Sequence, residues 1–121
     1  MPQTIEYMFY TGPMADNPAD RIIIARLTGT ARRHARHRAL TDGEHQAAVT
    51  ELAAIAQDRA DLLAEAAGIT AGAHAGDPDE PHHLRAAQLC IDAGADRSQV
   101  TRWTQEGQRR AAAARASRTP R

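Results

Sequence analysis

Apolar residues recur along much of this chain at the spacing of amphipathic helices. The clearest apolar stripe consists of Val49, Leu52, Ala53, Ala56, Ala60 and Leu63. Thr41 and Glu44 have the spacing of a capping box, so a helix is expected to begin there. Asp58 can divide the segment into one helix that ends near residue 57 and a second over 60–67, which Gly68 closes.

Two further helices are expected on either side of this segment. Asn17 has the character of an N-cap and a proline follows it, which predicts a helix over about 19–39 that is loosened at Gly29. The segment 69–81 is rich in glycine, proline and acidic residues and is therefore expected to be a loop. Pro81 then starts the next helix, and the predicted fold is all-α, with four to five helices and no sheet of more than two strands.

The length of 121 residues fits one domain with a thin hydrophobic core. Hydrophobic residues make up 42% of the chain, but 27 of these 51 residues are alanine, which favours helices and lets their backbones approach closely. We expect a homodimer, because association would bury more apolar surface. The predicted organisation is a flexible N-terminal segment (1–17), a single helical domain (18–116) with a two-helix corner at 81–114, and a basic tail (117–121).

The functional prediction depends on the stretch 86–110, which has the pattern of two helices joined by a tight turn. Gly94 can take the left-handed conformation that ends a helix, and Asp96 is placed to cap the next one. The residues that set the spacing of this corner are Leu89, Cys90, Gly94, Val100 and Trp103. This stretch resembles the helix-turn-helix of bacterial DNA-binding proteins, as small repressors and excisionase-like proteins carry it. Cys90 stands where alanine is usual in the motif, and its side chain is also small and apolar.

The resemblance implies that the second helix contacts double-stranded DNA, as in a transcriptional repressor or an excisionase-like accessory factor. The positions that the motif directs toward the major groove are Arg97, Ser98, Thr101, Arg102 and Gln105. Arg109 and Arg110 complete the expected DNA-binding set, Arg109 as a phosphate contact. Two alternatives stay open: the polar face is only the solvated side of an amphipathic helix, or it docks onto another protein in a helical adaptor that binds no DNA.

Charge is distributed unevenly although the formal net charge is zero. Residues 21–38 contain six arginines and no acid, residues 42–80 contain nine acids and one arginine, and residues 96–121 contain seven arginines and two acids. Both ends can therefore face phosphate. No apolar stretch is long enough to span a bilayer and no signal peptide is recognisable, so a cytoplasmic location is expected.

The pattern predicts no catalytic residue, metal site or cofactor. The chain has six histidines, and His74, His82 and His83 flank the acidic loop, but no H-E-x-x-H or C-x-x-C motif is present. The single cysteine, Cys90, lies in an apolar helical pattern and is expected to be a buried, unreactive thiol. There is no nucleophile elbow and no glycine-rich phosphate loop, so we do not expect an enzyme.

Overall fold

The computed structural model describes residues 17–36 and 38–118, which form five α-helices and contain no strand. The helices are α2 (Pro18–Ala35), α3 (Asp42–Ala56), α4 (Ala60–Ala73), α5 (Glu80–Asp92) and α6 (Arg97–Arg118). The predicted all-α class is confirmed. Of the predicted flexible segment, residues 1–16 lie outside the described residues, as do residues 119–121 of the predicted tail. None of the described helices combines the length and the apolar character needed to cross a bilayer.

Three helices begin at the capping residues that the sequence identifies. The side chain of Asn17 accepts a hydrogen bond from the backbone N–H two residues later, at 2.9 Å. Thr41 and Glu44 form the complete capping box, in which Glu44 N donates to Thr41 Oγ1 (3.2 Å) and Thr41 N donates to Glu44 Oε1 (3.0 Å). Asp96 accepts from the backbone N–H of Ser98 at 3.0 Å. Each of these bonds satisfies an N–H group that the helix itself leaves unpaired, so the three predicted starts are confirmed.

The break between α3 and α4 falls where the sequence predicts it. Gln57 and Asp58 both have left-handed backbone conformations, with φ of 52° and 67°. Because these conformations cannot continue a right-handed helix, the chain turns here and α4 begins at Ala60. The N–H of Gln57 donates to the carbonyl of Ala53 at 3.1 Å, which satisfies one of the last carbonyls of α3.

The prediction that Gly68 ends this helical region is wrong. Helix α4 continues to Ala73, so the first five residues of the expected loop at 69–81 are helical. The reason lies in the packing of α4 against α6, because a β-carbon on Gly68 would lie only 2.7 Å from the backbone nitrogen of Thr104. Glycine is a poor helix former, but here it lets two helix backbones touch, and that contact outweighs its low propensity.

Two other helix boundaries also differ from the prediction. Helix α2 ends at Ala35 instead of near residue 39, and it passes through Gly29 without a break. The guanidinium of Arg85 donates to the carbonyl of Ala35 at 3.0 Å and so satisfies a terminal carbonyl of α2. Helix α6 extends to Arg118, past the expected corner at 81–114 and into the predicted tail, and the alanines at 111–114 favour its continuation.

The hydrophobic core lies between α2, α3, α4 and α5. Leu27, Leu52 and Leu62 are fully buried, and alanines from all four helices fill the spaces between them. Cys90 belongs to this core, is 1% exposed, and burial raises the pKa of its thiol to about 12. The expected burial of this thiol is therefore confirmed.

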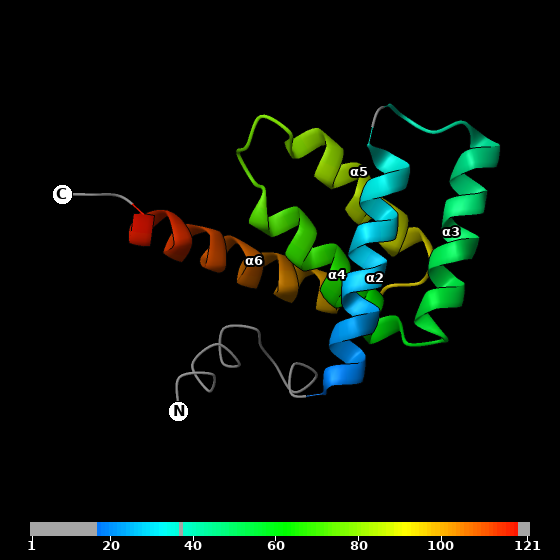
Figure 1. The fold of residues 1–121 in the computed structure, drawn as a ribbon, viewed down its shortest axis with the longest axis horizontal. Helices are drawn as coiled ribbons and strands as arrows, with labels where there is room; N and C mark the ends of the chain where they lie inside the picture. The colour runs from blue at the N-terminus through cyan, green and yellow to red at the C-terminus, as the bar shows by residue number, and fades with distance from the viewer. Residues whose placement is uncertain (1–16, 37, 119–121) are drawn as a thin grey trace.

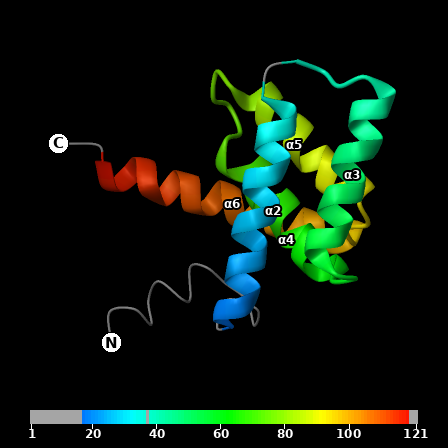
Figure 2. The ribbon, with the colours of Figure 1, turned by 45° about the vertical axis from the view of Figure 1, so that its right-hand side comes forward.

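Helix α6 packs mainly along α4 (Figure 1; Figure 2). Trp103 is buried against α4, and Gly107 lies close to the backbone of Ala73. Both views show the C-terminal part of α6 extending beyond the rest of the bundle, and residues 112–117 are all exposed. One side of α6 is thus anchored and the other is open to a partner.

Candidate functional site

Six of the seven residues predicted to bind DNA are exposed on one side of α6. This outer face of α6 consists of Arg97, Ser98, Thr101, Arg102, Gln105 and Arg109. On the opposite side, Trp103 and Gly107 are buried and Val100 is half-buried against the core. The division follows the period of the helix, with a polar face and an apolar stripe on opposite sides.

The seventh residue, Arg110, lies at the edge of the buried side. Its Nε donates to Glu106 Oε2 at 3.0 Å, and its side chain is only 20% exposed. Arg109 donates through its own Nε to Glu106 Oε1 at 3.0 Å. Glu106 therefore partly neutralises this end of the face, and Arg110 is less available to a ligand than the six exposed residues.

The N-terminal part of the outer face carries two positively charged side chains, Arg97 and Arg102. Neither of them forms an ion pair with another described residue, and the Arg102 guanidinium lies 5.5 Å from the centroid of the Trp103 ring. This cation–π contact places the charge at the boundary between the buried ring and the solvent. The Ser98 hydroxyl donates to the Asp96 carboxylate at 2.7 Å, so its oxygen is the atom left to accept a further bond.

The turn before α6 has the expected backbone, but the helices around it pack differently from the motif. Gly94 has φ of +127°, and the four residues 93–96 join the two helices. In the motif, the first helix packs closely on the second through residues such as Leu89 and Cys90. Here those two residues point into the core shared with α2, α3 and α4, and α6 packs mainly along α4.

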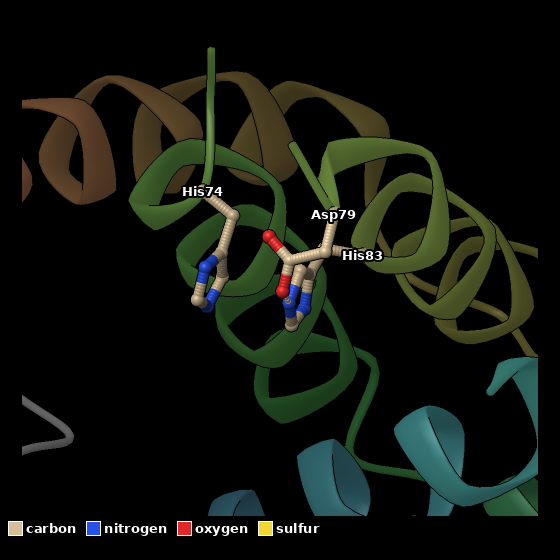
Figure 3. A group of neighbouring side chains, drawn as sticks. All are labelled: His74, Asp79 and His83. Atoms are coloured by element: carbon tan, nitrogen blue, oxygen red, sulfur yellow. Dashed lines mark hydrogen bonds and ion pairs between the residues drawn. The ribbon is translucent and has the colours of Figure 1, made fainter. Parts of the chain in front are cut away.

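A second candidate group, which the sequence did not predict, lies at the junction of α4 and α5 (Figure 3). His74 caps the end of α4, Asp79 directly precedes α5, and His83 lies in the first turn of α5. The three residues each offer one ligand atom, and these atoms lie within 4.8 Å of one another. The imidazole rings of His74 and His83 stack with their centroids 3.5 Å apart and an angle of 6° between their planes.

The loop between the two helices folds so that these side chains meet. Asp77 N donates to the His74 carbonyl at 3.0 Å, and Glu80 N donates to the Asp77 carbonyl at 3.0 Å, which forms two successive turns. Gly76, inside the first of these turns, has a left-handed backbone conformation with φ of +85°. The nine-residue spacing of the histidines matches no ligand motif, so only the acidic loop between histidines hinted at this group.

The chain matches no protein-family model, and no curated protein and no solved structure is significantly similar to it. Function must therefore be inferred from the geometry of the outer face of α6 and of the histidine–carboxylate group.

Proposed function

We propose that this protein binds double-stranded DNA through the outer face of α6, as a small transcriptional repressor or excisionase-like accessory factor. The observation that carries the proposal is the joint exposure of the six outer-face residues on a helix whose other side is packed against α4. A helix that is held from one side and polar on the other can enter the major groove, which is about 12 Å wide.

The charge of α6 supports this function. Residues 97–118 contain six arginines and one acid, although the whole chain has no net charge. Positive charge concentrated on one exposed element attracts the phosphate backbone without any sequence preference. The part of α6 that extends beyond the bundle would lengthen this contact along the duplex (Figure 1).

The side chains at the centre of the face have the groups needed to recognise bases. Arg102 can donate two hydrogen bonds to a guanine, and Gln105 can pair with the donor and acceptor of an adenine. Arg97 and Arg109, nearer the two ends of the face, would contact phosphates and set the orientation of the helix. Arg102 must leave the Trp103 ring to reach a base, at a cost of about 0.5–1 kcal/mol for an exposed cation–π contact.

The outer face is also accessible, because none of the other described helices covers it. A helical adaptor in which α3 packs on this face would bury Arg102, Gln105 and Arg109, and all three are exposed. An adaptor that used the exposed face for another protein would have no need to bind nucleic acid. Binding to DNA is therefore the property that separates the two functions.

The experiment is a salt titration of binding to a labelled random-sequence duplex. Wild type is compared with a double variant, Arg97→Ala with Arg109→Ala, and with a charge-matched control, Arg26→Ala with Arg32→Ala, which removes two exposed arginines of α2. We expect wild type to bind at low salt, and the α6 variant to lose about 1.8 from the slope of log K against log salt, about 0.9 per phosphate contact. The control should retain the wild-type slope.

The proposal fails if wild type does not bind the duplex at low salt, in which case the adaptor function takes its place. It also fails if the α2 control loses as much of the salt slope as the α6 variant, because the contact would then not belong to the outer face.

A further inference from the structure

We propose that His74, Asp79 and His83 form a binding site for a divalent transition-metal ion such as Zn²⁺, at the junction of α4 and α5 (Figure 3). The three ligand atoms already lie within 4.8 Å of one another. Around a tetrahedral zinc ion with bonds of about 2.0–2.2 Å, neighbouring ligand atoms are about 3.3 Å apart. The site therefore needs only a small closing movement to reach bonding distance.

The donor set fits this class of ion. Two imidazole nitrogens and one carboxylate oxygen are ligands that zinc and its neighbours bind in proteins, whereas Mg²⁺ and Ca²⁺ prefer oxygen ligands alone. Three protein ligands leave a fourth position for water or for Asp77. The Asp77 carboxylate lies 3.3 Å from His74 Nδ1 and can instead orient that ring, as carboxylates commonly do for metal-bound histidines.

His83 is the histidine whose ring is already fixed in position for binding the ion. Its side chain is only 6% exposed, so the surrounding packing holds the ring in place. Its Nε2 lies 3.0 Å from Asp79 Oδ2, and an ion held by these two atoms would replace the proton between them. Nδ1 of His83 is buried without a hydrogen-bond partner among the described residues, so it can carry the ring proton when Nε2 binds the ion.

His74 is the ligand that must move. Its ring is stacked almost parallel to the His83 ring, and lone pairs in two parallel rings do not converge on one point. The side chain of His74 is 27% exposed and lies at the start of the loop, so its ring can tilt without disturbing the core. Metal binding would thus exchange the stacked contact for two bonds that join the end of α4 to the start of α5.

The test uses the full chain, with Zn²⁺ as the probe and Mg²⁺ for comparison, in calorimetric titration and thermal unfolding. We expect one Zn²⁺ per chain and a rise of the thermal midpoint of at least about 5 °C at saturation, with no such rise in Mg²⁺. His74→Ala and Asp79→Asn change groups outside the core, and each should weaken Zn²⁺ binding by at least about 10–100-fold, the loss typical even of residues that only support a ligand.

The matched control is His45→Asn. His45 also pairs with a carboxylate, that of Asp92 at 2.9 Å, but no third ligand group is found beside that pair among the described residues. The His45→Asn variant should bind Zn²⁺ as tightly as wild type does. No binding by wild type, or equal losses in His45→Asn and His74→Ala, would overturn the proposal.

Discussion

Gly68 of α4 and Trp103 of α6 are so close that a β-carbon on Gly68 would overlap the β-carbon of Trp103 and lie 2.8 Å from its carbonyl carbon. Gly72 repeats the contact one turn later, where a β-carbon would lie 2.9 Å from the backbone nitrogen of Gln108. On the other helix, a β-carbon on Gly107 would lie 3.0 Å from the backbone nitrogen of Ala73. Three glycines thus bring the two backbones together, and this contact fixes which side of α6 faces outward.

Gly68→Ala is therefore expected to destabilise the fold. The new methyl group would meet the β-carbon of Trp103 and the α6 backbone, which cannot move aside cheaply, so we expect a loss of about 1–3 kcal/mol, as for other overpacked sites. Gly29→Ala is the matched control, because nothing lies within 4 Å of its β-carbon position in α2. That variant should gain about 0.5–1 kcal/mol from helix propensity alone. Urea unfolding of both variants tests the prediction, and equal stabilities would contradict it.

The same contact explains which parts of the fold could be predicted from the sequence. Capping by Asn17, Thr41 and Asp96 acts within a few residues, so the helix starts could be predicted from the chain alone. The continuation of α4 through Gly68 could not be predicted, because local propensity opposes it and only the distant α6 favours it. Local rules therefore identify the elements, and their lengths depend on contacts between segments far apart in the sequence.

The two candidate sites differ in the same way, because one could be predicted from the local sequence and the other depends on how the chain folds. The outer face of α6 follows from the helical period, so its exposed residues could be identified without the structure, with the exception of Arg110. The group formed by His74, Asp79 and His83 depends on how the loop turns at Gly76. No spacing rule describes such a turn, so the sequence alone predicts no metal site there.

Replacing Trp103 by alanine should unfold the domain or leave it without fixed packing. Trp103 is 4% exposed and is the single tryptophan of the chain. Truncation of a buried tryptophan typically costs about 3–5 kcal/mol, a large part of the stability of a small domain. Circular dichroism and thermal unfolding test this expectation. A cooperative transition at the wild-type midpoint would mean that α6 is held by its glycines and not by this ring.

Glu65 should make the fold less stable as the pH rises from 5 to 8. The residue is 1% exposed, and neither carboxylate oxygen has a hydrogen-bond partner among the described residues. Burial raises its pKa from 4.5 to about 7, against the attraction of Arg110. The folded state therefore holds a proton that the unfolded state has released, and stability is lost between pH 4.5 and about 7. The shift corresponds to about 3 kcal/mol.

Glu65→Gln removes this titration, because the amide stays neutral. Its stability relative to wild type should increase by up to about 3 kcal/mol between pH 5 and pH 8 in urea unfolding. Glu44→Gln serves as the control, since bonding to Arg38 lowers the pKa of Glu44 to about 2 and places its titration below this range. A Glu65→Gln advantage that is the same at both pH values would show that the carboxyl group is already ionised in the folded protein.

The prediction that is most specific to DNA recognition concerns Arg102. This residue is exposed at the middle of the outer face, and its loss should change the free energy of unfolding by about 1 kcal/mol or less, mainly through the cation–π contact with Trp103. Arg102→Ala should nevertheless weaken binding to a site selected from a random-sequence library by about 1–3 kcal/mol, if the guanidinium contacts a base. Binding to unrelated duplexes should change much less, so the ratio of specific to random binding should fall.

Arg109→Ala should behave differently, because Arg109 lies two turns further along α6 and already shares Glu106 with Arg110. As a phosphate contact, its loss should weaken all sequences alike and reduce the salt slope by about 1. Titration of both variants against the selected site and a random duplex, at two salt concentrations, separates the two roles. If Arg102→Ala weakens both duplexes equally, Arg102 contacts only phosphate, and base recognition must come from Gln105 or from another part of the outer face.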